Sequence, residues 1–176
     1  MPLFQRLPIR SASSAFRFHA RNFCQLRTMA TKDQLQTLRN YTACDISDAL
    51  LKLKVPNCGF LPDLNLYTPL AASQTSQVLV APASTVLFAP KSATEPSGYP
   101  PANVPAGKHY VDLTEPETIV VISQPKGQIC AVLGGIMALR MKVLNAKGVV
   151  VHGRVRDVEE LASTGLPVSI SLIFKK

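Results

Sequence analysis

The sequence predicts an α/β fold with a mostly parallel sheet. The chain has 176 residues, of which 47% are hydrophobic and 17% charged, and this supplies enough apolar material for the core of one domain. From residue 118 onward, short β-branched runs alternate with segments of helical periodicity. Strands that alternate with helices are joined by crossover connections, so we expect them to pair in parallel.

Capping signals predict two helices after residue 30. The first signal is a capping box that starts at Thr31, with leucines following at helical spacing. The second signal starts at Thr42, and Pro56 ends the helix that follows it. The side chains expected to face the core from this second helix are Ile46, Ala49, Leu50 and Leu53.

The middle of the chain is predicted to contain two short strands and a long loop. The strands are expected over 77–81 and 84–88, on either side of Pro82. Residues 90–106 contain five prolines, so this segment is predicted to be a loop. A loop of this length in a compact domain is usually either functional or disordered.

The most regular pattern begins at residue 118. A β-branched run over 118–122 predicts a buried strand, and a second short apolar segment covers 129–133. After the pair Gly134 and Gly135, a helix is expected over 136–146, ended by Lys147 and Gly148. Its apolar positions, which are expected to face the core, are Ile136, Leu139, Val143 and Ala146.

A strand, a helix and a final strand complete this pattern. Residues 148–151 form an apolar run, and a helix is expected from Asp157 because acidic residues fill its first turn. The last strand is expected over 167–174. Cys44 and Cys130 are expected to be small core residues, since the four cysteines form no Cys-x-x-Cys pair.

The net charge of +8 is concentrated at the N-terminus. Residues 1–30 contain five arginines and no acidic residue, which leaves a net charge of +3 for the remainder. An Arg-rich, Ser-containing, acid-free segment is typical of a mitochondrial transit peptide. The alternatives are a disordered basic tail or upstream sequence included in an over-long gene model. We therefore expect a leader over 1–29 and a folded domain over 30–176.

This charge distribution also limits the partners that the sequence predicts. Mitochondrial localisation is expected, or a cytosolic form where translation starts at Met29. Nucleic-acid binding is not expected, because the basic excess lies in the leader and the chain has no Trp and only 6% aromatic residues. A membrane partner is not expected either, since the apolar run over 129–139 is far shorter than a membrane span.

Two segments are predicted to meet beyond the carboxyl ends of the strands, where ligands bind in such sheets. One is the Gly134–Gly135 turn, where glycine permits close approach to the backbone and the helix amides favour an anion. The other follows residues 148–151 and carries Arg156, which suits a carboxylate, and Asp157, which suits a hard divalent cation. Together they suit a small oxo-acid.

Each of these residues also has a structural interpretation. The glycine pair could serve only tight packing between a strand and a helix. Asp157 could be a helix N-cap with Arg156 as its surface partner, and Glu160 a solvated first-turn acid. His152 could be a base at the edge of the site or a hydrogen-bonded histidine at a strand end.

The motifs resemble the RraA-like family. This family includes divalent-metal-dependent 4-hydroxy-4-methyl-2-oxoglutarate/4-carboxy-4-hydroxy-2-oxoadipate aldolases and the regulators of ribonuclease E activity. The resemblance covers roughly residues 40–168, and the proline-rich loop is most similar to fungal members. Gly135, twenty intervening residues, the pair Arg156–Asp157, and Glu160 three residues later match the family's spacing. The segments that carry the resemblance are 44–50 (CDISDAL), 116–121 (PETIVV), 131–138 (AVLGGIMA) and 148–157 (GVVVHGRVRD).

The resemblance implies a role for each site residue. Arg156 would be the catalytic residue and would hold the substrate carboxylate and carbonyl oxygen. Asp157 would bind Mg²⁺ or Mn²⁺, and Glu160 would support the metal through water. The glycine turn, Gly134 and Gly135, and the amides of Ile136 and Met137 would bind the carboxylate of the pyruvyl group.

The resemblance also implies an activity, a fold and an assembly. The activity is cleavage of the C3–C4 bond of a 2-oxo acid through a metal-stabilised pyruvate enolate, as an aldolase, as an oxaloacetate decarboxylase, or as both. The fold is a three-layer β/β/α swivelling domain, and the cleft lies between subunits of a homotrimer or hexamer. Because the sequence after about residue 168 departs from the family, we expect truncated or altered C-terminal strands. A non-catalytic interaction module and an inactive isoform remain the alternatives.

Overall fold

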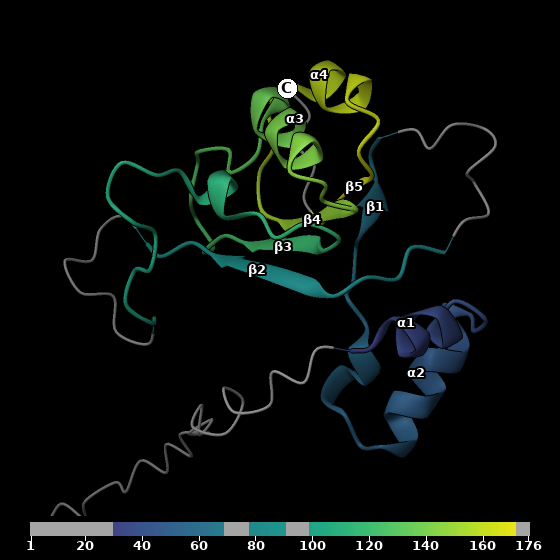
Figure 1. Cartoon of the computed structure of the whole chain (residues 1–176). Coiled ribbons are helices and arrows are strands. Elements are labelled where there is room, and N and C mark those ends of the chain that lie inside the picture. The colour runs from purple at the N-terminus through teal and green to yellow at the C-terminus, as the bar shows by residue number, and fades with distance from the viewer. Residues whose placement is uncertain (1–29, 69–77, 91–98, 172–176) are drawn as a thin grey trace, which may run out of the picture.

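A five-stranded sheet forms the centre of the protein, whose computed structural model describes residues 30–68, 78–90 and 99–171 (Figure 1). The spatial order is β1-β5-β4-β3-β2, in which β2 to β5 pair in parallel and β1 runs antiparallel to β5. The predicted α/β class and mostly parallel sheet are confirmed. The leader predicted over 1–29 lies outside the described residues. The strands are β1 (Asn65–Leu66), β2 (Ala83–Leu87), β3 (Ile119–Ser123), β4 (Gly148–His152) and β5 (Val168–Ile170).

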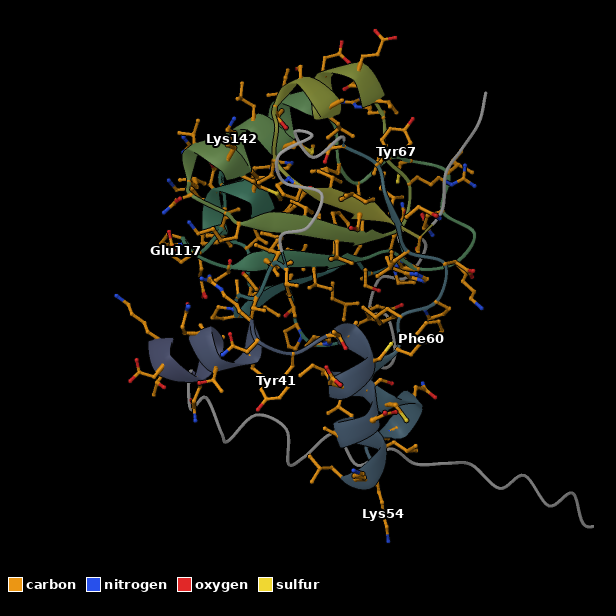
Figure 2. All side chains as sticks on the ribbon, turned by 90° about the vertical axis from the view of Figure 1, so that its right-hand side faces the viewer. Tyr41, Lys54, Phe60, Tyr67, Glu117 and Lys142 are labelled. Atoms are coloured by element: carbon orange, nitrogen blue, oxygen red, sulfur yellow. The ribbon has the colours of Figure 1, made fainter. Side chains whose placement is uncertain are left out.

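Helices lie on both sides of the sheet but cover its faces unequally. Helices α3 (Gly135–Val143) and α4 (Val158–Ser163) pack on one face, whereas α1 (Lys32–Leu38) and α2 (Ala43–Lys52) lie on the opposite side (Figure 2). Both predicted capping boxes are present at the starts of α1 and α2. The described residues also form two short 3-10 helices, η1 (Pro56–Gly59) and η3 (Tyr110–Leu113).

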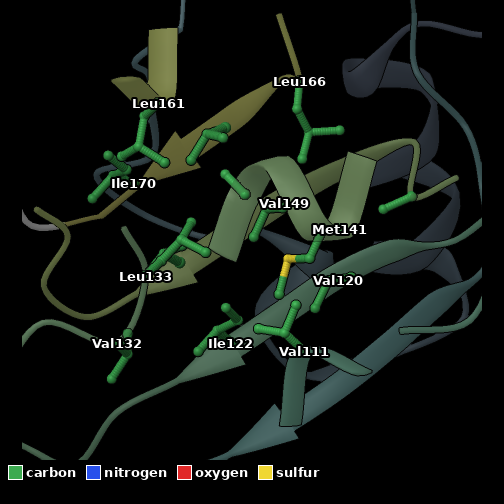
Figure 3. Packing of buried hydrophobic residues seen from close by; sticks show 14 residues of the cluster. Val111, Val120, Ile122, Val132, Leu133, Met141, Val149, Leu161, Leu166 and Ile170 are labelled. Atoms are coloured by element: carbon green, nitrogen blue, oxygen red, sulfur yellow. The ribbon is translucent and has the colours of Figure 1, made fainter. Parts of the chain in front are cut away.

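The core lies between the sheet and the pair α3 and α4 (Figure 3). Alternate side chains of the central strands, such as Ile122, Val151 and Ile170, are fully buried there, against Met141 of α3 and Leu161 of α4. The opposite face of the sheet is only partly buried, and none of the described residues of α1 and α2 is buried. The described residues contain one sheet, so a second sheet of a three-layer arrangement is not among them.

Helix α3 turns a different face to the core from the one predicted. The buried positions are Gly135, Ala138 and Met141, while Ile136 and Val143 are 86% and 68% exposed. The helix is apolar on both faces, so its sequence does not decide which face meets the sheet. It also ends at Val143, earlier than predicted, because Asn145 adopts a left-handed conformation with φ of 66°.

Other expectations need smaller corrections. Residues 78–81 form no strand, and β2 begins at Ala83, after Pro82. Cys44 and Cys130 are exposed, so the expectation that they are core residues is wrong. The predicted stripe of α2 is also less buried than expected, since Leu53 is 73% exposed. Within residues 30–68, 78–90 and 99–171, no helix combines the length and the hydropathy needed to cross a membrane.

Candidate functional site

The two predicted site segments lie side by side beyond the carboxyl end of β4. The amide of Val132 donates to the carbonyl oxygen of Arg154 at 2.8 Å, and the amide of Arg156 donates to that of Leu133 at 3.0 Å. Leu133 and Val155 form an isolated parallel bridge between these bonds. The backbone leading into the glycine turn is therefore tied to the backbone that carries Arg156.

The glycine turn is buried where the two segments meet. Gly134 is the N-cap residue of α3, and a Cβ atom at this position would stand 2.8 Å from Oδ2 of Asp157 and 3.1 Å from Nε of Arg156. A Cβ atom at Gly135 would overlap with Cβ of Glu160 in α4. Gly135 therefore allows the two helices to pack, while Gly134 leaves room for the side chains of the Arg–Asp pair.

Arg156 and Asp157 form an exposed ion pair beside the turn. The distance from Nε of Arg156 to Oδ2 of Asp157 is 3.4 Å, and their side chains are 68% and 45% exposed. Asp157 occupies the N-cap position of α4, yet among the described residues its carboxylate bonds Arg156 and does not cap the helix. Its backbone is left-handed, with φ of 56° and ψ of 53°, a conformation that costs free energy in a non-glycine residue. The structure therefore agrees with the structural interpretation in placing Asp157 at the N-cap position with Arg156 as its surface partner, and differs from it only in that the carboxylate does not cap the helix.

Asp157 and Glu160 are the acids available to hold a cation here. Glu160 is an exposed residue in the first turn of α4, directly against Gly135. No group of three or more His, Cys, Asp or Glu side chains gathers anywhere in the described part of the chain. Carboxylate oxygens suit Mg²⁺, which characteristically binds one or two carboxylates and keeps several waters or substrate oxygens. Asp157 and Glu160 supply the number of carboxylates that such an ion uses, and water and substrate oxygens would have to complete its coordination.

The first turn of α3 supplies backbone donors to the same place. Gly134 has no side chain with which to cap the helix, and the first amides of a helix have no intrahelical acceptor. The partly buried Met137 and the exposed Ile136 carry two of these amides. The partial positive charge of a helix N-terminus favours an anion next to the guanidinium of Arg156.

His152 does not join this group. Because β4 alternates, the side chain of His152 lies on the same sheet face as Val150, opposite to the face that packs on α3 and α4. Its Nδ1 atom lies 2.9 Å from Oγ of Ser171, at the end of the neighbouring strand. The structure therefore supports the interpretation of His152 as a hydrogen-bonded residue at a strand end.

Sequence reasoning missed residues that hold the site together. Buried Gln124 accepts a hydrogen bond from the amide of Arg154 at 3.0 Å and donates one to the carbonyl oxygen of Cys130 at 2.7 Å. The hydroxyl of Tyr110 donates to the carbonyl oxygen of Val132. An isolated Gln or Tyr has no pattern that predicts such contacts, since the partners are distant backbone groups.

A pocket of about 660 Å³ lies at the other end of the sheet. It is lined by one face of α1, through Lys32, Leu35 and Arg39, and by residues next to the amino ends of the strands, such as Pro82 and Lys147. Its lining includes none of the predicted site residues. Ligand sites of parallel sheets lie at the carboxyl ends, so this pocket is separate from the candidate site.

Solved structures share this fold. The crystal structure of RraAS2 from Streptomyces coelicolor, titled an unusual member of the RNase ES inhibitor RraA protein family, superposes with a TM-score of 0.60 and 16% identity over 82% of this chain and 65% of that one. An uncharacterized protein from Pseudomonas syringae pv. tomato superposes with a TM-score of 0.59 and 22% identity over 84% of this chain and 59% of that one. The chain thus spans less than two thirds of both structures, and the similarity shows the fold.

Sequence comparison gives the family. Protein DlpA of Legionella pneumophila is 33% identical over 141 residues, which cover 80% of this chain and 20% of that protein. The chain therefore spans about a fifth of this curated relative. The family model for RraA-like proteins, described as Aldolase/RraA, matches residues 43–174, a range that includes the glycine turn and the Arg–Asp pair. The chain belongs to the RraA-like family.

Proposed function

We propose that the protein is a divalent-metal-dependent lyase that cleaves the C3–C4 bond of 2-oxo acids. The substrates proposed are 4-hydroxy-4-methyl-2-oxoglutarate, oxaloacetate, or both. The observation that carries the proposal is the ion pair of Arg156 and the left-handed Asp157 beside buried Gly134. A cation, an acid and backbone amides converge there, which is the set of groups that a charged oxo-acid requires.

In this proposal, each residue of the site binds a different part of the substrate or the metal ion. The guanidinium of Arg156 binds the substrate carboxylate and carbonyl oxygen. The amides of Ile136 and Met137 donate hydrogen bonds to the same carboxylate. Asp157 would hold Mg²⁺ or Mn²⁺, and Glu160 would support the ion through water. When bound, the ion supplies positive charge to the oxygen that becomes negative as the bond breaks.

The electron flow is the same for both substrates. The electron pair of the C3–C4 bond moves to C3 and gives the enolate of pyruvate, which Arg156 stabilises through its oxygen. In the aldol substrate the C4 hydroxyl gives its proton to water and C4 leaves as a second 2-oxo acid, whereas in oxaloacetate C4 leaves as CO₂. Protonation of the enolate at C3 by water then gives pyruvate.

The proposal includes a homotrimer or hexamer. The exposed apolar residues of α3, namely Ile136, Leu139 and Val143, are 86%, 52% and 68% exposed and lie along one side of the helix. An apolar helix face open to water is a candidate interface, and here it begins at Ile136, within the candidate site. A second subunit on this face would close the exposed site from the side of α3.

Two alternatives belong to other functional classes. A non-catalytic regulator is favoured by the same exposed face of α3, which could bind a different protein, and an inactive isoform requires no metal site at all. The carboxylates beside the glycine turn favour the enzyme, because a pure interaction module has no need of them.

For localisation we propose mitochondria, or the cytosol when translation starts at Met29. A fluorescent fusion of the full chain and one starting at Met29 test this.

Pyruvate release tests the proposed activity. The purified chain is incubated with oxaloacetate or with 4-hydroxy-4-methyl-2-oxoglutarate, in the presence of Mg²⁺ or Mn²⁺ and, in parallel, of EDTA. We expect pyruvate formation that requires the metal and that is lost in the Arg156→Ala variant. A folded protein that releases no more pyruvate than the metal-containing buffer alone contradicts the lyase.

A further inference from the structure

The hydroxyl of Tyr110 is anchored directly beneath the glycine turn. Tyr110 is the first residue of η3, and its ring packs edge-on against Phe88, with ring centroids 5.3 Å apart and planes at 79°. The hydroxyl donates to the carbonyl oxygen of Val132 and lies 3.5 Å from Sδ of Met137. Burial raises the pKa of Tyr110 to about 12, so the hydroxyl remains a donor throughout the physiological pH range.

Val132 is the point at which this hydrogen bond can affect the site. Its amide donates to Arg154, and the next carbonyl, that of Leu133, accepts from the amide of Arg156 at 3.0 Å. Gly134 follows immediately. A displacement of the Val132 peptide would therefore move the glycine turn and the backbone of Arg156 together.

A second contact attaches η3 to helix α3. Asp112, two residues after Tyr110, forms an ion pair with Arg140 of α3 at 3.1 Å, and its other carboxylate oxygen accepts from the amide of His109. The 3-10 helix is therefore held at its start and attached to the middle of α3. This attachment holds the Tyr110 ring next to the segment that precedes the glycine turn.

We propose that Tyr110 is a positioning residue that sets the geometry of the glycine turn, and of the Arg156 backbone tied to it, through the carbonyl of Val132. Its effect on the position of the turn rests on the hydrogen bonds of Tyr110 to Val132 and of Arg156 to Leu133. Its effect on ligand binding rests on the proposed function, in which the turn and Arg156 hold an oxo-acid anion.

The Tyr110→Phe variant tests this, because it keeps the packing against Phe88 and removes only the hydroxyl. The matched control is Thr114→Val, which removes another hydroxyl at η3, bonded at 2.6 Å to the carbonyl oxygen of Val111, away from the glycine turn. Two measurements are made on the full chain: hydrogen exchange of the amides of Val132 and Arg156, which are hydrogen-bonded in the structure, and the affinity for oxalate in the presence of Mn²⁺.

In Tyr110→Phe we expect exchange of these amides to accelerate about tenfold and oxalate binding to weaken about tenfold, as loss of one buried hydrogen bond predicts, while Thr114→Val changes neither. Unchanged exchange in Tyr110→Phe, or equal acceleration in both variants, overturns the proposal. If the unmodified protein binds neither Mn²⁺ nor oxalate, the proposed lyase fails, and the exchange data alone decide the role of Tyr110.

Discussion

The carboxylate of Asp157 occupies the space beside Gly134 that a side chain at this position would need. A Cβ atom at position 134 would stand 2.8 Å from the Oδ2 atom of Asp157. The backbone of Gly134 is extended, with φ of −136° and ψ of 177°, so no unusual conformation requires glycine here. What a Cβ atom would meet here is the exposed side chains of Arg156 and Asp157, which would have to move. The position therefore tests whether the arrangement of this ion pair matters for function.

We predict that Gly134→Ala removes metal-dependent pyruvate release while the fold persists. The added methyl group must displace the side chains of Asp157 and Arg156, and Ala is also a poorer N-cap than Gly, at a cost of up to about 1 kcal/mol. The Gly134→Ser variant separates the two effects, since Ser caps helices well but crowds Asp157 equally. Activity that returns in Gly134→Ser would assign the defect to capping and would contradict the steric explanation.

The second prediction concerns the charge of Asp157. In Asp157→Asn, the shape of the side chain and its tolerance of the left-handed conformation are kept, but the carboxylate is lost. We expect loss of Mn²⁺ binding, measured by electron paramagnetic resonance, with a change in unfolding free energy of less than about 0.5 kcal/mol for this exposed site. Glu159→Gln serves as the control, because this acid occupies the same first turn of α4. Equal Mn²⁺ binding by the two variants would show that Asp157 is not a ligand.

The sequence predicts the positions of the strands better than it predicts which face of a helix is buried. The β-branched runs place β3 and β4 within one residue of their positions in the structure, because a buried parallel strand is apolar throughout. Helix α3 shows the limit of this reasoning. Ile136 and Val143 form an apolar stripe as regular as that of Ala138 and Met141, and a helix with two apolar sides does not reveal which one meets the sheet.

The site shows a similar division. Motif spacing brings Gly134 and Arg156 together correctly, because both follow strands or strand-like segments that end at one edge of the sheet. The same reasoning did not predict that His152 would face away from them, which depends on strand register. It also missed Tyr110 and Gln124, whose hydrogen bonds go to backbone groups and leave no pattern in the sequence.

A third prediction concerns the dependence of stability on pH. The backbone amide of His109 and the guanidinium of Arg140 lower the pKa of Asp112 below its usual value. A lowered pKa in the folded state means that Asp112 stabilises the fold above its unfolded pKa and ceases to do so as the pH falls through the folded value. In urea unfolding, Asp112→Asn should therefore be less stable than the unmodified protein at pH 7, and the difference should shrink below about pH 4.

The Arg140→Gln variant, alone and combined with Asp112→Asn, assigns this effect to the ion pair. If the two residues act together, the double variant loses less stability at pH 7 than the sum of the two single losses. A stability difference between Asp112→Asn and the unmodified protein that is the same at pH 7 and pH 3 would mean that the Asp112 carboxylate does not stabilise the fold through its charge.

The last prediction concerns the exposed face of α3. Leu139→Glu and Val143→Glu each place a charge on the exposed apolar face of α3 without touching the core, since both residues are more than half exposed. If this face binds a second subunit, the charge must be desolvated on assembly, so the variants should dissociate to monomers at concentrations where the unmodified protein is oligomeric. Light scattering after size exclusion measures this, and Lys126→Glu, on an exposed loop, is the control. Oligomers of unchanged mass in both α3 variants would place the interface elsewhere and leave this face available to a different partner.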